Sequence, residues 1–247
     1  MSEDKAYKLL ALQEGISNSQ AKTLIDKGLV YIGTRKVLIA RGNISEKTKF
    51  RVEKIEKTRV IFENKEMIVV DKPAFLSSEE IERQYKGARL LHRLDRETSG
   101  VLVLCKDEEF RLKAIEEFKH DRVYKEYIAW VDGMVIEEFE INKPIVTEKH
   151  NNKAKSKVSE GGKPARTEVF PLMVVNKKSK IKLVIHQGRT HQIRVHLQSE
   201  NLPIMGDELY GGRKAKRMML HAHKMKLLGK EFTSPEPKEF RHIGGGE

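Results

Sequence analysis

Residues 92–100 (HRLDRETSG) are polar or glycine at eight of nine positions, and the run 101–105 (VLVLC) that follows is entirely apolar. A short apolar run bounded by turn-forming residues is typical of a strand buried in a sheet. The polar segment cannot itself be a core element, because charged side chains are not buried without partners. It places one carboxylate, Asp95, between Arg93 and Arg96 and ends in a turn-forming Thr-Ser-Gly. The sequence therefore predicts a carboxylate-bearing loop that leads directly into a central strand.

The chain is strongly basic. Its 247 residues include 48 Lys and Arg against 36 Asp and Glu, a formal net charge of +12, which indicates a polyanionic partner, most simply RNA or DNA. No apolar run approaches the roughly 20 residues of a membrane-spanning helix, and the N-terminus lacks the apolar segment of a signal peptide. The single cysteine, Cys105, fits a reducing compartment and a core position. We therefore expect a cytoplasmic, monomeric protein that does not bind a membrane.

The charge predicts two domains. The first 55 residues hold 11 Lys and Arg against 6 Asp and Glu, whereas the remaining 192 hold 37 against 30. The basic charge is therefore denser in the first segment. We expect a small α/β domain over 1–55, a linker at 54–58 and a larger domain over 56–247.

The first segment has the pattern of two helices and a strand. Gly15 is placed to end the first helix, and Ser17 and Gln20 have the capping-box spacing of a second. Gly28 follows that helix, and residues 29–32 read as a short strand. A generic small helical domain would fit the same pattern.

After residue 58 the pattern becomes rich in strands. A strand pair is expected over 59–72, further strands at 101–105 and 124–131, and a helix over 107–120 that Asp107 caps. Residues 143–182 hold 11 Lys and Arg against 3 Asp and Glu. We expect strands there, joined by a mobile basic loop at 149–164; the alternative is a solvated, lysine-rich hairpin.

Four segments in order resemble the RluA-type pseudouridine synthases, which convert uridine in RNA to pseudouridine. The segments are DKPAFL (71–76), LLHRLDRETSGVLVL (90–104), KEYIAWVDG (125–133) and GRTHQIRVHLQSENLPIMGDELYG (188–211), the last followed by MLHAHKM (219–225). Four ordered matches are much stronger than one. The family usually has glycine where this chain has Phe75, so the loop there is expected to differ in shape.

The resemblance implies an α+β catalytic domain with a mixed, largely antiparallel central sheet, and it implies the site. Asp95 is the catalytic carboxylate, acting on the base, on the sugar or as a proton acceptor. Arg194 pairs with Asp95, and Tyr127 stacks on the target uracil and helps to remove its C5 proton. Leu220 completes the apolar wall, and Arg93 fills the gap left by the flipped uridine. The structural alternatives are that Arg194 is a surface arginine on a short helix capped by Thr190, and that Tyr127 is a core residue of a strand.

Residues 15–37 (GISNSQAKTLIDKGLVYIGTRKV) resemble the RNA-binding module of ribosomal protein S-four. In that family the second helix and the turn after it face the RNA. The resemblance implies phosphate contacts from four cations, Lys22, Lys27, Arg35 and Lys36. Such a module would dock the enzyme on RNA without reading its sequence.

The reaction of that family breaks the bond between N1 of uracil and the ribose and rejoins the base through C5. It transfers no electron and no phosphate, so we expect no cofactor. The histidines raise a metal-site alternative, because His186, His191 and His196 recur every five residues. That spacing diverges by roughly 140° on a helix and alternates faces on a strand, so we expect structural hydrogen bonds and no metal.

We therefore expect an RNA pseudouridine synthase acting on large-subunit ribosomal RNA, by analogy with family members that carry a similar N-terminal module. Transfer RNA is the alternative substrate. The alternative from another class is a non-catalytic RNA-binding or ribosome-assembly factor.

Overall fold

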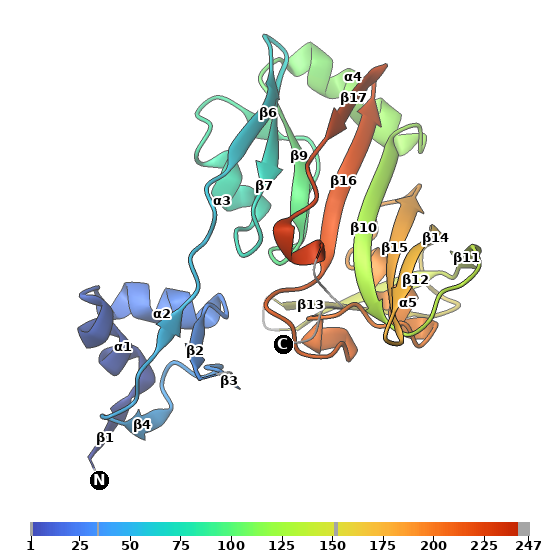
Figure 1. Ribbon diagram of the computed structural model, residues 1–247. Coiled ribbons are helices and arrows are strands. Elements are labelled where there is room, and N and C mark those ends of the chain that lie inside the picture. Colours follow the sequence, from blue (N-terminus) through green and yellow to red (C-terminus); the bar gives the residue numbers. More distant parts are fainter. Residues whose placement is uncertain (1, 34, 151–152, 242–247) are drawn as a thin grey trace. The chain divides into compact units, whose positions relative to one another are not determined.

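The computed structural model describes residues 2–33, 35–150 and 153–241 (Figure 1). The chain divides into two compact units, Met1–Glu56 and Lys57–Glu247. Within the described residues no helix is both long and apolar enough to span a bilayer.

The N-terminal unit is a helical pair with two small sheets. Its helices are α1 (Ala6–Glu14) and α2 (Asn18–Asp26). One sheet pairs β1 (Glu3–Lys5) with β4 (Asn43–Ser45), and the other has the order β3-β2-β5, formed by Arg35–Lys36, Val30–Ile32 and Arg51–Val52. The fold class of the unit, small and mixed α/β, is as expected.

Local sequence signals set the helix ends in this unit. Gly15 ends α1 with φ 65°, a left-handed conformation that glycine adopts without strain. The Ser17 side chain accepts from the Gln20 backbone N–H, and the Gln20 side chain accepts from Ser17, which completes the predicted capping box. The two helices bury a single small core with the adjoining strands, formed by Ala6, Leu10, Ala11, Ala21, Ile25, Val30, Val37 and Phe50.

The larger unit is built on a ten-stranded mixed sheet with the order β11-β14-β15-β10-β16-β9-β7-β6, as the resemblance implied (Figure 1). In addition β17 pairs with β16, and β8 with β9. The strands are β6 (Arg59–Glu63), β7 (Met67–Lys72), β8 (Arg89–Leu90), β9 (Ser99–Cys105), β10 (Tyr124–Asp132), β11 (Phe139–Asn142), β14 (Arg166–Val175), β15 (Lys178–Ile185), β16 (Leu220–Leu227) and β17 (Lys230–Thr233). The helical elements are α3 (Ser78–Glu82), α4 (Glu108–Lys119), α5 (Gln192–Ser199) and the short η1 (Glu208–Tyr210) and η2 (Lys238–Phe240).

The apolar run 101–105 forms β9 and is buried on both faces of the sheet. Val101 and Val103 belong to the core that Phe110 and Ala114 of α4 cover, whereas Leu102 and Leu104 belong to the core on the opposite face. Side chains alternate between faces along a strand, so a wholly apolar run is required where both faces are covered. Cys105 ends the run as a buried residue, and burial raises the pKa of its thiol to about 11.

A parallel pairing brings the polar loop beside the start of β16. All other pairs in the sheet are antiparallel, but Ser99 and Gly100 of β9 lie opposite His221 and Ala222 of β16 in parallel register. Gly100 is essential to this approach, because a Cβ there would lie 2.1 Å from the Ala222 carbonyl oxygen. The pairing places Leu220 next to the residues that follow Asp95.

The prediction of a basic loop at 149–164 was wrong. Residues 145–158 form an antiparallel hairpin, β12 (Ile145–His150) paired with β13 (Lys153–Val158), and residues 151–152 lie outside the described residues. The alternative, a lysine-rich hairpin, is what the structure contains. Its base is not merely solvated, because Ile145 and Val158 pack in a small core with Val195 of α5 and Tyr210 of η1.

Candidate active site

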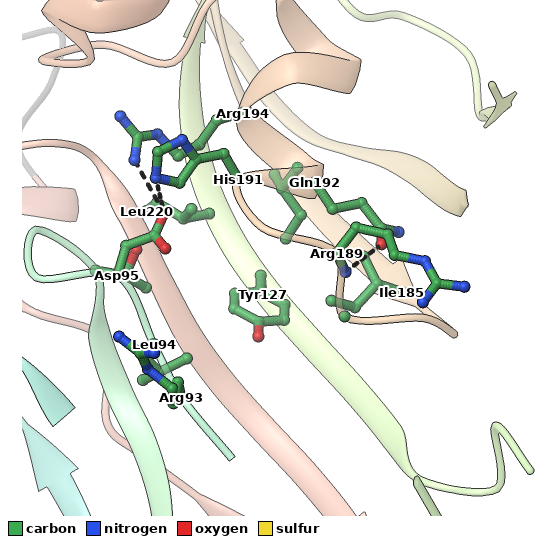
Figure 2. Close-up of a pocket in the computed structure, with 13 residues that line it drawn as sticks. Arg93, Leu94, Asp95, Tyr127, Ile185, Arg189, His191, Gln192, Arg194 and Leu220 are labelled. Carbon is green, nitrogen blue, oxygen red and sulfur yellow. Dashed lines mark hydrogen bonds and ion pairs between the residues drawn. The ribbon is translucent and has the colours of Figure 1, made fainter. Parts of the chain in front are cut away.

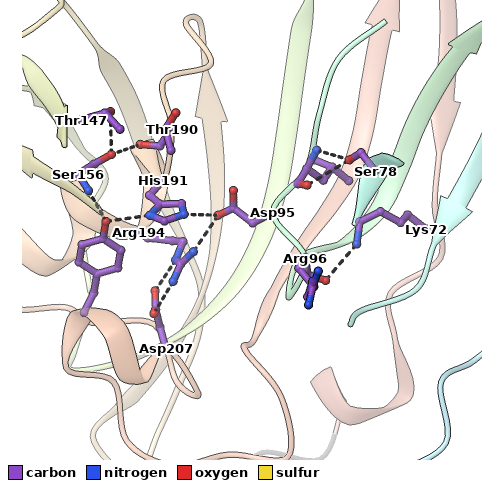
Figure 3. A network of polar contacts seen from close by, with 12 residues as sticks. Lys72, Ser78, Asp95, Arg96, Thr147, Ser156, Thr190, His191, Arg194 and Asp207 are labelled. Carbon is purple, nitrogen blue, oxygen red and sulfur yellow. Dashed lines mark hydrogen bonds and ion pairs between the residues drawn. The ribbon is translucent and has the colours of Figure 1, made fainter. Parts of the chain in front are cut away.

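The loop that carries Asp95 is anchored on both sides of that residue. The Ser78 hydroxyl accepts from the Leu94 N–H (3.0 Å) and donates to the Leu94 carbonyl (3.1 Å). On the other side, the Arg96 carbonyl accepts from the Lys72 ammonium (3.2 Å) and the Phe75 N–H (2.8 Å). Figure 3 shows Ser78, Lys72 and Arg96 on one flank of Asp95. These contacts fix the backbone from which the carboxylate projects.

Lys72 is fully buried and is held entirely by backbone carbonyls. Its ammonium donates to the carbonyl oxygens of Pro73, Leu76 and Arg96. Burial and the nearby Arg217 charge lower the pKa of Lys72 to about 7. This side chain therefore ties the 73–76 turn to the Asp95 loop.

Phe75 occupies the turn where glycine was expected from the resemblance. Its φ is 72°, in the left-handed region that glycine favours. This conformation is strained for a residue with a Cβ. The hydrogen bond from the Phe75 N–H to the Arg96 carbonyl, and those from Lys72 to the carbonyls of Pro73 and Leu76, offset that strain. The backbone shape that favours glycine is present here with a phenylalanine in its place.

Arg194 bridges two carboxylates. Its Nε and Nη2 donate to Asp207 (2.7 and 2.8 Å), and its Nη1 donates to Asp95 Oδ2 (3.0 Å). The side chains of Arg194 and Asp207 are 5% and 1% exposed, whereas that of Asp95 is 27% exposed. Burial alone would lower the pKa of Arg194, but the hydrogen bonds and charges of Asp207 and Asp95 outweigh it and raise that pKa. The arginine is therefore a fixed cation that orients Asp95 (Figure 3).

His191 lies beside Arg194, on the same flank of Asp95 (Figure 3). Its Nε2 is 3.8 Å from Asp95 Oδ2, and its Nδ1 is 2.9 Å from the Tyr210 hydroxyl. His191 precedes α5 with φ 54°, and no side chain caps that helix, so Thr190 does not cap it. Burial lowers the pKa of His191, against the opposing charge of Asp95. The imidazole is therefore neutral near pH 7.

The pocket beside Asp95 has an apolar wall made by Tyr127, Ile185 and Leu220 (Figure 2). Tyr127 lies on β10, where a bulge between Glu126 and Tyr127 interrupts the pairing with β16, and bulges of this kind redirect side chains next to active sites. Burial and the Asp95 charge raise the pKa of Tyr127. A flat, neutral phenol thus faces the pocket.

Arginines line the rim of the same pocket. Arg93 is 74% exposed and pairs with Glu79 of α3 (2.8 Å). Arg189 donates through Nε to the Pro164 carbonyl (3.0 Å), and its backbone N–H donates to the Gln192 side chain (Figure 2). Two guanidinium groups at an open mouth favour a ligand with phosphates.

The four cations predicted to contact RNA in the N-terminal unit lie on α2, its end and β3. Lys22 lies 4.2 Å from the centre of the Tyr7 ring. Lys27 is the C-cap residue that follows α2, and the Lys36 stem packs over the next residue, Gly28, where a Cβ would lie 3.3 Å from Lys36 Cδ. Arg35 is exposed on the same short strand as Lys36. Lys27 and Lys36 are thus neighbours around Gly28.

The histidines make hydrogen bonds, as predicted. Besides His191, His186 contacts Glu168, His196 contacts Thr167, and both His221 and His223 contact the Ser234 carbonyl. Across residues 2–33, 35–150 and 153–241 no group of three or more His, Cys, Asp or Glu side chains is arranged to hold a metal ion.

Comparisons with known proteins identify the family of this chain. The model of the RNA pseudouridylate synthase family matches residues 66–199, more than half of the chain. An uncharacterized RNA pseudouridine synthase of Helicobacter pylori strain J99 is 52% identical over 240 residues, 96% of this chain and 99% of the relative. The ribosomal large subunit pseudouridine synthase D of Borreliella burgdorferi is 39% identical over 161 residues, 61% of this chain and 49% of the relative.

The fold is also similar to that of a solved structure of the same family. The structure of human RNA pseudouridylate synthase domain containing 1 superposes with a TM-score of 0.66 at 28% identity, over 74% of this chain and 84% of that one. The fold is thus that of the RNA pseudouridylate synthases, which are isomerases. The chain belongs to the RNA pseudouridylate synthase family, and its activity is the conversion of uridine in RNA to pseudouridine.

The structure brings Asp95, Arg194, Tyr127, Leu220 and Arg93 to one pocket. Sequence reasoning assigned no role in this site to Asp207, His191 or Tyr210, which contact Arg194, Asp95 or one another. All three lie in the segment 188–211 that carried the family resemblance. The signal was present, but nothing in their spacing shows that they converge on Arg194 and Asp95.

Proposed function

We propose that Asp95 is the catalytic carboxylate of this enzyme, and that Arg194 keeps it ionised and oriented. The single observation that carries this proposal is the geometry of Arg194, which spends two donors on buried Asp207 and directs the third at Asp95 Oδ2. The carboxylate that remains partly exposed faces a pocket with an apolar wall. That is the arrangement needed beside the bond between N1 and C1′ of a flipped uridine.

In the proposed reaction the N1–C1′ bond breaks, the uracil rotates and a C5–C1′ bond forms; C5 loses its proton and N1 gains one, so the product is an isomer of the substrate. Asp95 acts on the base, on the sugar or as the proton acceptor that starts an elimination. Tyr127 contacts the loose base as a neutral phenol. Because its pKa is raised, Tyr127 stays protonated at neutral pH and cannot accept the C5 proton, and we assign it stacking and not proton removal.

Leu220 and Arg93 complete the proposed substrate site. Leu220 is buried at the start of β16 and supplies apolar contact to the base. Among the described residues the Arg93 side chain is held by one exposed ion pair, with Glu79, and exposed pairs contribute about 1 kcal/mol or less. Its guanidinium is therefore free to exchange Glu79 for RNA and to fill the gap that the target uridine leaves.

We further propose that Met1–Glu56 is an S-four-like RNA-binding domain and that the substrate is large-subunit ribosomal RNA. Lys22, Lys27, Arg35 and Lys36 are the proposed phosphate contacts, and the basic charge of the whole chain supports an RNA partner. The relative from Borreliella burgdorferi carries a ribosomal large subunit name, which favours ribosomal over transfer RNA. Such a substrate implies work in the cytoplasm.

The test is to map pseudouridines by chemical labelling in total RNA from three strains: wild type, a deletion, and the deletion complemented with Asp95→Asn. We expect sites in large-subunit ribosomal RNA to vanish in both mutants. Loss confined to transfer RNA would overturn the substrate assignment. Persistence of every site in the Asp95→Asn strain, with loss in the deletion, would overturn the role of Asp95.

A further inference from the structure

A chain of hydrogen bonds runs from the β12–β13 hairpin to the pocket. The backbone N–H of Ser156, on β13, donates to the Tyr210 hydroxyl (2.8 Å), and that hydroxyl lies 2.9 Å from His191 Nδ1. His191 Nε2 in turn faces Asp95 Oδ2 at 3.8 Å. These contacts thus connect the hairpin and η1 with the residue before α5 and, through it, with Asp95.

The hairpin is held in place at Ser156, where the series of hydrogen bonds begins. Ser156 is 1% exposed, its hydroxyl donates to the Thr190 carbonyl (2.7 Å), and it lies 3.0 Å from the Thr147 hydroxyl of β12 (Figure 3). Tyr210 is itself buried, and its ring lies 5.1 Å from the Arg194 guanidinium. Neither partner can turn away without losing packing.

These contacts favour one of the two neutral tautomers of His191. The Tyr210 hydroxyl oxygen accepts from the Ser156 backbone N–H. Among the described residues, His191 Nδ1 is the acceptor that lies within reach of the Tyr210 hydroxyl proton. Donation to Nδ1 requires that nitrogen to be unprotonated. A neutral imidazole then carries its proton on Nε2, the nitrogen that faces Asp95.

We propose that His191 is a positioning residue for Asp95, with Tyr210 and the Ser156 amide fixing the tautomer that points an N–H at the carboxylate. The hairpin is thereby a working part of the active site. The distance of 3.8 Å is outside hydrogen-bond range, and such contacts often shorten only when substrate is bound. Arg194 and His191 then both contact Asp95 Oδ2.

This inference rests on the proposed role of Asp95. Its first test is the tautomer itself, read from the side-chain ¹⁵N shifts of His191 in the intact protein. We expect a protonated Nε2 and an unprotonated Nδ1 in the wild type. A proton on Nδ1 would overturn the proposal without any variant having to fold.

The second test is Tyr210→Phe, which removes the hydroxyl and keeps the ring beside Arg194. We expect the single-turnover rate at saturating enzyme to fall about 5- to 10-fold, the size typical of one lost hydrogen bond, with the Kd for RNA unchanged and a mixture of His191 tautomers. An unchanged rate would refute the proposal. His191→Gln and His191→Leu are a matched pair, because both place a side chain at the same strained backbone position. Only glutamine provides an N–H toward Asp95, so we expect the single-turnover rate of His191→Gln to be higher than that of His191→Leu.

The two proposals fail differently. If Asp95→Asn retains activity, the proposed function is wrong. If Asp95→Asn is inactive while Tyr210→Phe and His191→Leu react at the wild-type rate, the assignment of Asp95 stands and only the role of His191 is lost.

Discussion

The two units use charge in opposite ways. In the larger unit Arg194 and Asp207 are almost completely buried. The hydrogen bonds that Arg194 donates go to the carboxylates of Asp207 and Asp95. In the N-terminal unit the core is wholly apolar, and the cations proposed to contact RNA lie outside it. A buried charge that is fixed in one geometry can direct chemistry, whereas charges on a surface can attract a polyanion without fixing its register.

The sharpest way to break this comparison is Asp95→Asn. Because the amide keeps the shape and removes the charge, we expect product formation to fall by about 1,000-fold or more, while RNA affinity changes less than about 3-fold. The measurements are single-turnover pseudouridine formation and filter binding on a ribosomal RNA transcript. Glu109→Gln, an exposed carboxylate on α4, is the control and should do neither. Parallel loss of rate and binding would mean that Asp95 serves the fold.

The second prediction contrasts a buried ion pair with an exposed one. Asp207→Asn leaves Arg194 buried with one charged partner, so we expect a loss of about 3 kcal/mol in unfolding free energy and a rate lowered by about 10- to 100-fold as Asp95 loses its orientation. Glu79→Gln removes the partner of the exposed Arg93 and should cost about 1 kcal/mol or less. Urea unfolding measures both. Equal costs would refute the distinction.

The third prediction concerns the N-terminal unit. Replacing Lys22, Lys27, Arg35 and Lys36 together with glutamine should weaken RNA binding and reduce the slope of log Kd against log salt by about three to four units. The rate at saturating RNA should be unchanged. Lys113→Gln with Lys119→Gln, two cations already paired on α4, should alter the slope less. An unchanged slope in the fourfold variant would end the docking role of this unit.

Local signals made much of the fold predictable. The Gly15 helix end, the Ser17 capping box and the Asp107 cap of α4 each depend on residues a few positions apart. The strands at 101–105 and 124–131 follow from apolar runs, and β9 and β10 contain them. The hairpin at 145–158 was not predicted as first choice, because its outward face is lysine-rich and its anchoring depends on Ile145 and Val158 meeting a distant helix.

The site was predictable only as far as motif identity reaches. Asp95 and Arg194 were paired in advance by resemblance, and the structure places them 3.0 Å apart. The share of Asp207 in that pair, and the tautomer of His191, depend on contacts made in three dimensions by α5, η1 and β13. No periodicity in the chain encodes such contacts.

The smallest expected effect concerns histidine, which is absent from the first 56 residues. Burial lowers the pKa of His221 to about 4, so the folded state keeps it neutral while the unfolded chain takes up a proton below pH 6.5. The unfolded state then binds more protons, and stability falls as pH falls; between pH 6.5 and 5.5 we expect a loss of about 1 kcal/mol from this residue. His196, also fully buried with a lowered pKa, acts in the same direction. Urea unfolding at both pH values measures the loss, and His221→Gln should make it smaller. If His221→Gln and the wild type lose stability equally, His221 is not the neutral buried group proposed here.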